Sequence, residues 1–172
     1  MLISAALLTG LAFFWGNFRE LVFAFRIKDL VIAVLSAVLL WFVFYAGDAI
    51  SRMLFPFARP EVDAVYAMRD GQNSHFLALA LMLWIGPAEE IFWRGYVQRS
   101  LEGRFGKWTA LLIATAIYAA VHLWSFNFML IMAALICGAF WGMLYLYNRN
   151  LVTVIVSHVL WDVGIFILFP IM

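Results

Sequence analysis

Two adjacent carboxylates and an arginine stand in an otherwise apolar stretch between Trp84 and Gly95. If this stretch crosses a membrane, each charge near the bilayer centre costs at least about 2.5–3.5 kcal/mol, so such groups pair, face a cavity or mark a functional site. Glu90 and Arg94 are four residues apart and share a helix face, where a charge-assisted pair can form. Glu89 points away from that arginine. We therefore predict that Glu90 orients Arg94, and that Glu89 is the free carboxylate suited to take a proton from water.

A proline directly precedes the two acids. Pro87 has no amide hydrogen, so the helix loses the bond to the carbonyl of Leu83, and Gly86 weakens the same turn. The pattern predicts a kink or a local opening there. An ordinary membrane-helix proline is the simpler interpretation, whereas the functional one gives room for water or a substrate backbone beside Glu89.

Two histidines on separate apolar runs add to this pattern. His122 ends one run, and His158 lies one turn before Asp162, so that pair shares a helix face. A lone buried histidine is more often a packing residue, but two of them alongside acids favour a site. His75 falls at a membrane boundary and is predicted to be a snorkelling or loop residue rather than a catalytic one.

The composition predicts that these groups are held by membrane helices. The chain has 172 residues, 67% hydrophobic and 12% charged, whereas a soluble domain is about half apolar and a quarter charged. Runs that are apolar on every face exclude a barrel, and the lack of a basic face argues against nucleic acid as a partner. We expect one all-α membrane domain over 1–172, a helical bundle around a cavity with a motif-bearing core at about 76–172. Six spans are predicted, at about 1–18, 30–47, 76–97, 108–126, 128–147 and 151–171.

The connecting segments predict an orientation. The first, third and fifth loops carry eight positive residues, against three in the second and none in the fourth, which predicts that both termini lie outside. The segment 48–75 reads as partly interfacial, and 101–107 as a break with two glycines. Gly138 and Gly142 are predicted to let another helix pack closely, within the monomer rather than at a dimer contact. The eight positive residues of the first, third and fifth loops are Arg19, Arg26, Lys28, Arg94, Arg99, Arg104, Lys107 and Arg149.

Three motifs in this order resemble the CPBP family of intramembrane proteases. They are Glu-Glu-x-x-x-Arg from Glu89, aromatic-x-x-x-His ending at His122, and His-x-x-x-Asp from His158. That family includes CAAX prenyl endopeptidases and Abi-like bacterial relatives linked to bacteriocin processing, immunity and removal of C-terminal membrane anchors. The chain differs from the usual pattern where Tyr118 and Trp93 replace phenylalanine and Asp162 replaces the frequent asparagine.

The resemblance implies roles for these residues. Glu89 matches the general base that activates water and His122 matches its partner. His158 and Asp162 match the pair that polarises the scissile carbonyl and stabilises the oxyanion, while Glu90 and Arg94 match the orienting pair. The hydroxyl of Tyr118 is a candidate auxiliary group. An ionised Asp162 would repel an oxyanion, so we expect it to be protonated, paired with His158 or bound to a metal.

A glutamate mechanism without a metal is preferred, because the compact His-Glu-x-x-His motif is absent from the sequence. In the alternative, zinc would be bound by Glu89, His122 and His158 and would keep a position for water. Helices drawn straight also place His122 at a different depth from Glu89, unless its span begins deeper or the helices tilt.

We therefore predict a multi-pass intramembrane endopeptidase of a bacterial or archaeal cytoplasmic membrane. Its substrate is a protein or peptide with a C-terminal membrane-associated or sorting segment, and its oligomeric state, monomer or homodimer, is left open. One alternative is a catalytically silent scaffold or immunity protein of the same fold. Another is a proton-coupled transporter, because membrane-embedded Glu, His and Asp also build proton relays; it would need inverted repeats with paired broken helices.

Overall fold

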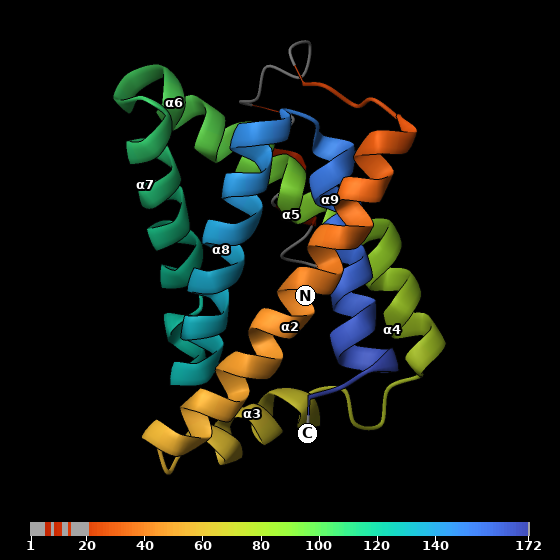
Figure 1. Ribbon diagram of the computed structural model, residues 1–172, viewed down its shortest axis with the longest axis vertical. Helices are drawn as coiled ribbons and strands as arrows, with labels where there is room; N and C mark the ends of the chain where they lie inside the picture. Colours follow the sequence, from red (N-terminus) through yellow and green to blue (C-terminus); the bar gives the residue numbers. More distant parts are fainter. Residues whose placement is uncertain (1–5, 8, 12–13, 15–20, 172) are drawn as a thin grey trace.

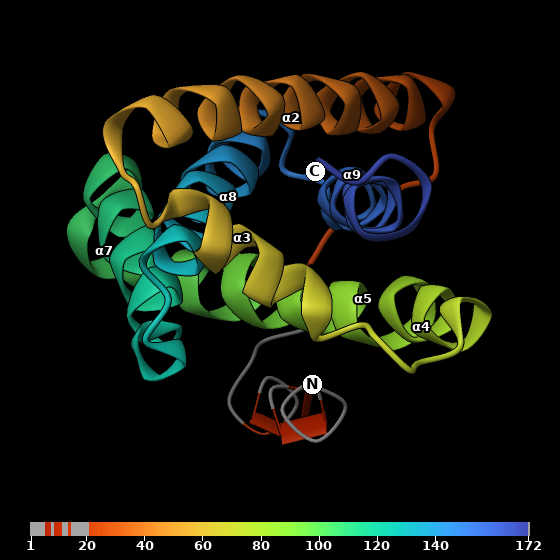
Figure 2. The ribbon, with the colours of Figure 1, turned by 90° about the horizontal axis from the view of Figure 1, so that it is seen from below.

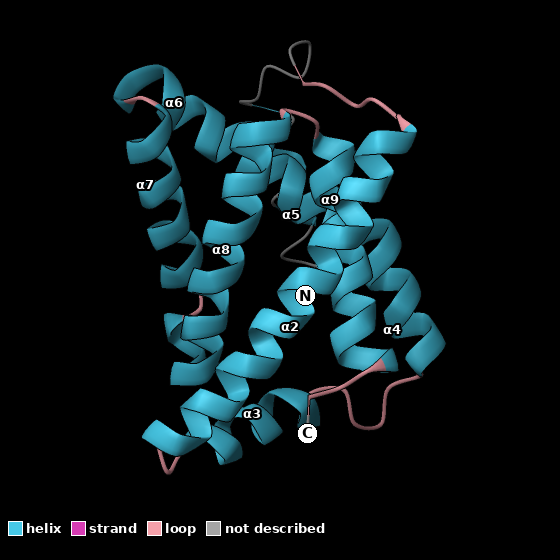
Figure 3. Ribbon diagram, viewed as in Figure 1, coloured by secondary structure: helices cyan, strands magenta, loops and turns pink. Residues whose placement is uncertain are grey.

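The computed structural model describes residues 6–7, 9–11, 14 and 21–171. Within them the chain is helical and contains no strand (Figure 3). Five helical stretches are long and apolar enough to cross a membrane, which confirms five of the six predicted spans; the predicted span 1–18 lies mostly outside the described residues. The α-helices are α2 (Ile27–Leu54), α3 (Ala58–Ala67), α4 (Ser74–Ala80), α5 (Gly86–Glu90), α6 (Arg99–Phe105), α7 (Lys107–Ala120), α8 (Phe128–Asn148) and α9 (Leu151–Val163).

The helices pack around α9 and α8 (Figure 1). Helix α9 contacts α2 on one side and α5 on the other, and Figure 2 shows α2 and the α4–α5 stretch on opposite sides of it. Helix α8 packs against α7 and α9. The core contains Leu40, Trp141 and Val154, each without exposed surface, while large apolar side chains such as Leu39 and Phe42 point outward. An apolar exterior around a packed interior is the arrangement that lipid requires.

Asparagine side chains cap the N-termini of the last two long helices, α8 and α9. Asn127 Oδ1 accepts a hydrogen bond from Leu130 N at 2.8 Å, and Asn150 Oδ1 accepts one from Val152 N at 3.1 Å. Each bond pairs an amide that the first turn of a helix leaves without a partner. The caps explain why the observed starts of α8 and α9 agree with the predicted ones.

The loops between the spans fall into the two groups that were predicted, one at each end of the bundle. Arg149 donates to Glu102 at 2.6 Å, and Asn150 donates to Ala24 O at 2.7 Å, so the first, third and fifth connections share one end of the bundle. Asn127 donates to Glu61 O at 2.8 Å, which brings the second and fourth connections together. Which end faces the cytoplasm stays a prediction. Its charge count needs one correction, because Arg94 is buried within the bundle; Arg19 lies outside the described residues.

One predicted break is wrong in detail. The helical stretch 74–105 runs on through most of the expected connector 101–107, and the chain turns only at Gly106, whose φ of +78° suits glycine. The segment 48–75 contains the end of α2 and all of α3, and its partly interfacial position stays a prediction.

The predicted opening before the acids is confirmed. The residues Leu81–Ile85 form a π-helical turn in which Gly86 N bonds to Leu81 O, so this turn holds one residue more than an α-helical turn. A second π-helical stretch, Ile91–Gln98, follows Glu90 directly. The two acids therefore sit on one short α-helical turn between two wider ones.

The two glycines of α8 allow close packing inside the monomer, as predicted. A Cβ on Gly138 would lie 3.2 Å from Tyr118 Cδ1 and 3.3 Å from Thr115 Cγ2, both on α7. On Gly142 it would lie 2.5 Å from Leu111 Cδ1 and 3.0 Å from Gln98 Oε1. A larger residue at either position requires the facing side chains of α7 or Gln98 to move.

Gly142→Ala is accordingly expected to lower the free energy of unfolding by about 1–3 kcal/mol, as overpacking does elsewhere. Detergent-induced unfolding of the purified protein measures this change. Gly47→Ala is the matched control, because a Cβ there meets nothing within 4 Å and alanine favours the helix. Equal losses in both variants would contradict close packing at Gly142.

Candidate active site

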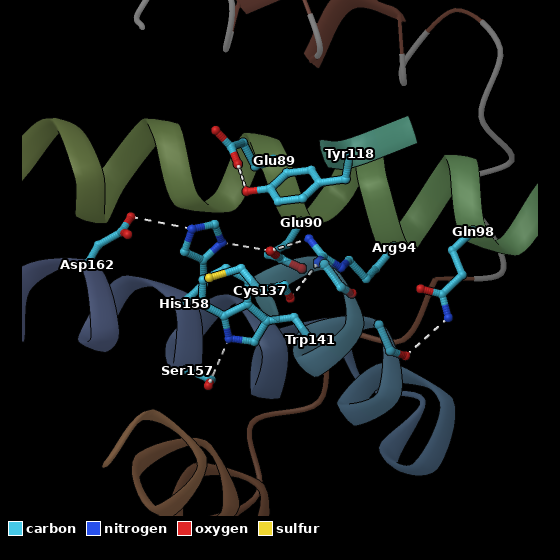
Figure 4. Close-up of polar contacts among 12 residues, drawn as sticks. Glu89, Glu90, Arg94, Gln98, Tyr118, Cys137, Trp141, Ser157, His158 and Asp162 are labelled. Atoms are coloured by element: carbon cyan, nitrogen blue, oxygen red, sulfur yellow. Dashed lines mark hydrogen bonds and ion pairs between the residues drawn. The ribbon is translucent and has the colours of Figure 1, made fainter. Parts of the chain in front are cut away.

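Glu90 is the centre of a buried polar cluster formed by α5, α9 and the π-helical stretch after Glu90 (Figure 4). Its side chain has no exposed surface. Its Oε1 accepts a hydrogen bond from Arg94 Nη1 at 2.8 Å and another from His158 Nδ1 at 2.7 Å. The predicted Glu90–Arg94 pair is confirmed. The bond to His158, which links two helices, was not predicted.

Arg94 is satisfied on several sides. Its Nη2 lies 3.3 Å from the carbonyl oxygens of both Cys137 and Gly138, and the guanidinium lies over the ring of Tyr118, 5.2 Å from the centroid. One turn later, Gln98 Nε2 donates to Gly142 O at 3.1 Å. A buried charge is tolerated when it is paired and its remaining donors are bonded. Gln98 was not predicted, although its spacing of four from Arg94 in a membrane span was a signal.

Arg94→Met should therefore be strongly destabilising. It removes one partner of a fully buried carboxylate, which typically costs about 3–5 kcal/mol, and the free energy of unfolding in detergent measures the loss. Arg59→Met is the control, since Arg59 pairs with the exposed Asp63 at 2.9 Å and such surface pairs contribute about 0–1 kcal/mol. Similar effects in the two variants would show that the Glu90–Arg94 pair does not stabilise the bundle.

His158 and Asp162 form the second half of the cluster. Both side chains are buried, and His158 Nε2 lies 3.4 Å from Asp162 Oδ2, as their spacing predicted. Because a carboxylate accepts, Nδ1 of His158 carries the hydrogen shared with Glu90. Of the three states expected for Asp162, the structure shows pairing with His158.

Glu89, next to Glu90 in α5, is half-buried and has a hydrogen-bond partner. Its Oε2 accepts a hydrogen bond from the hydroxyl of Tyr118 on α7 at 3.0 Å. Tyr118 was predicted as an auxiliary group, and this contact confirms that its hydroxyl lies in the site. The second oxygen of the carboxylate is left to accept from another group.

His122 lies beyond the end of α7, one turn after Tyr118. Its Nδ1 is 2.8 Å from Tyr118 O; a carbonyl oxygen only accepts, so Nδ1 carries the hydrogen and Nε2 of the neutral ring is an acceptor. Its ring contact is also with Tyr118, at 5.3 Å between centroids. These contacts link His122 to Tyr118, whose hydroxyl reaches Glu89; the expected difference in depth between His122 and Glu89 stays a prediction. The pairing of His122 with Glu89 stays a prediction.

The residues considered for zinc do not form a ligand set as they lie. In the described part of the chain no three His, Cys, Asp or Glu side chains gather with metal-binding geometry. Glu89 contacts Tyr118, whereas His158 Nδ1 is committed to Glu90. A zinc site of Glu89, His122 and His158 would require these side chains to move from their present partners.

Between Arg94, Thr115 and Tyr118 lies a cavity of about 10 Å³. It has room for about one water molecule and none for a peptide. Glu89, in contrast, has partly exposed surface. Of the two adjacent acids, Glu89 is thus the one with surface open to an approaching group.

Comparison with known proteins identifies a protein family. The family model described as Type II CAAX prenyl endopeptidase Rce1-like matches residues 71–164, which is more than half of the chain. No curated protein and no solved structure matches the chain. The matched segment includes Glu89, Glu90 and Arg94 at one end and His158 and Asp162 at the other.

Proposed function

Since the chain belongs to the Rce1-like family of type II CAAX prenyl endopeptidases, we propose that this intramembrane peptide hydrolase uses Glu89 to activate water. The bond that it cleaves lies near the C-terminus of a membrane-associated protein or peptide. One observation carries the assignment: Glu89 is partly exposed and, among the described residues, is hydrogen-bonded to the Tyr118 hydroxyl alone, whereas Glu90 and Asp162 are buried and paired with His158.

The first step is the attack of water on the scissile carbonyl. The hydroxyl of Tyr118 fixes one oxygen of the Glu89 carboxylate, so that the other oxygen accepts a proton from water. The water oxygen then bonds to the carbonyl carbon, whose π electrons move to the carbonyl oxygen. His122 lies one helical turn after Tyr118, and its Nε2 is available to accept a hydrogen bond. We assign it the role of assisting Glu89.

The second step requires stabilisation of the oxyanion. With Nδ1 held by Glu90, Nε2 of a protonated His158 lies 3.4 Å from Asp162, too far for a strong hydrogen bond, so the Nε2–H can donate to a developing negative charge beside it. Arg94 keeps Glu90 in place. The intermediate collapses when Glu89 returns its proton to the leaving nitrogen, which yields a carboxylate and an amine.

The substrate side of the proposal starts from the surroundings of the site. The cluster is enclosed by helices whose outer faces are apolar, so the substrate is one that already resides in the bilayer. A protein with a C-terminal transmembrane sorting tail fits this setting better than a soluble peptide. A prenylated CAAX-type C-terminus is the second substrate class.

Cleavage by the purified protein in lipid nanodiscs tests the function. The substrates are a peptide with an apolar C-terminal tail, a prenylated CAAX peptide, and for each a control with the tail or the prenyl group removed. Mass spectrometry of the products should show one new C-terminus near the membrane-associated end, and cleavage should survive a chelator. Loss on chelation would move the mechanism to a metal, and cleavage of the controls alone would contradict the substrate class.

A further inference from the structure

Trp141 on α8 lies against the ring of His158. The indole and imidazole are stacked, with 3.7 Å between ring centroids and 21° between planes. Trp141 has no exposed surface and stands between Gly138 and Gly142, the two glycines at which α8 lies close to α7. No polar pattern in the sequence pointed to it.

A hydrogen bond from its ring nitrogen also holds the indole of Trp141 in place. Trp141 Nε1 donates to Ser157 Oγ at 3.2 Å, and the Ser157 hydroxyl is hydrogen-bonded to that of Ser36 on α2 at 2.9 Å. Ser36 also bonds to Ala33 O at 2.9 Å. Both serines are buried. The orientation of the indole is therefore fixed by three helices, α2, α8 and α9.

The stack restricts the one movement of His158 that its hydrogen bonds leave free. Glu90 binds Nδ1 of the imidazole at 2.7 Å, whereas Asp162 lies 3.4 Å from Nε2, so the Nε2 side of the ring is held less tightly. The ring can still tilt about the Nδ1–Glu90 hydrogen bond, and this tilt moves Nε2 and redirects its N–H. A rigid ring pressed against one face of the imidazole opposes that tilt.

We propose that Trp141 is a positioning residue that sets the tilt of His158 and so directs its Nε2–H at the scissile carbonyl oxygen. This inference rests on the proposed function. Errors of about 1 Å in such a group can cost about 100-fold in rate. A residue that only filled the core would affect stability without a specific effect on the chemical step.

Three variants separate these roles. Trp141→Phe keeps an aromatic ring on His158 and loses only the bond to Ser157, whereas Trp141→Leu loses the stack. Trp161→Leu is the matched control, because Trp161 is another buried tryptophan of the same cluster, and its ring contacts are with Phe44, Trp141 and Phe166. Each variant is compared as the full chain in nanodiscs, with thermal stability recorded.

The first readout does not depend on protease activity. The chain has three histidines, so ¹³C-histidine NMR can be assigned by single substitutions. We expect the His158 ring protons to be displaced upfield by the indole in the wild type, the Phe variant and Trp161→Leu. The displacement should vanish in Trp141→Leu. An unchanged His158 signal in that variant would overturn the stacking and with it the proposal, whether or not a cleavable substrate is known.

The second readout is the kinetics on a cleaved tail peptide. Trp141→Leu should lower kcat about 10- to 100-fold with KM changed less than about twofold, and Trp141→Phe should restore most of the rate. Trp161→Leu should leave kcat within about threefold. Equal losses in the two leucine variants would contradict a positioning role. A wild type that cleaves nothing, with the NMR result intact, would instead contradict the proposed function.

Discussion

Glu89→Gln is expected to lower kcat for peptide cleavage by about 10²- to 10⁴-fold, the range that general-base catalysis contributes. The amide cannot take a proton from water, but it has nearly the same shape and can still accept the hydrogen bond from Tyr118. The fold should therefore be unchanged. Initial rates of product formation by the purified variant, measured together with its thermal stability, check this expectation.

Tyr118→Phe is the companion variant to Glu89→Gln. It keeps the base and removes the hydroxyl that orients it, so a smaller loss of about 10-fold is expected. If Glu89→Gln retained the wild-type rate, Glu89 would not be the base. If Tyr118→Phe were as inactive as Glu89→Gln, the hydroxyl would have a direct chemical role.

His158→Gln is expected to produce the second large effect, a loss of about 10²- to 10³-fold in kcat, as when one oxyanion donor is removed elsewhere. The substitution deletes the ring nitrogens that contact Glu90 and Asp162. Because Glu90 then loses one of its two partners, a decrease in stability should accompany the loss of activity. Steady-state kinetics and detergent unfolding on the same preparation measure both effects.

The control for that variant is another histidine. His75→Gln alters an exposed residue in the first turn of α4 and should change neither kcat nor stability. A His158→Gln protein with normal kcat and reduced stability would show that the buried cluster serves packing alone. That result would favour the scaffold alternative.

Contacts within one helix could be predicted from the sequence, and contacts between helices could not. The pairs Glu90–Arg94 and His158–Asp162 followed from a spacing of four, which places both members on one face. The bond between Glu90 and His158 joins residues 68 apart in the chain. It depends on how α5 and α9 are rotated and shifted against each other, and no spacing in a single sequence gives that register.

The helical spans followed largely from hydropathy, and their errors have physical causes. The stretch 101–107 looked like a break because it holds two glycines and three charges. The helix nevertheless continues to Phe105, since a glycine within a helix is costly but tolerated. Glu102 in this stretch also accepts a hydrogen bond from Arg149 at the same end of the bundle. Only Gly106, with positive φ, ends it.

Residues without a polar motif were the hardest to foresee. Trp141 is one of eight tryptophans in the chain, and nothing in its sequence neighbourhood sets it apart. Its place against His158 arises from the packing of α8 on α9. Ser157 and Gln98 are similar, because small or neutral polar residues are common in membrane helices and carry little information singly.

The most direct test of the central claim is cleavage of the tail peptide in H₂¹⁸O by wild-type protein and by Glu89→Gln, with the products analysed by mass spectrometry. If Glu89 activates water for peptide hydrolysis, the new C-terminal carboxylate from the wild type carries one ¹⁸O atom, and Glu89→Gln yields almost no product in the same time. Labelled product formed at the wild-type rate by Glu89→Gln, or product without ¹⁸O from the wild type, would contradict the mechanism.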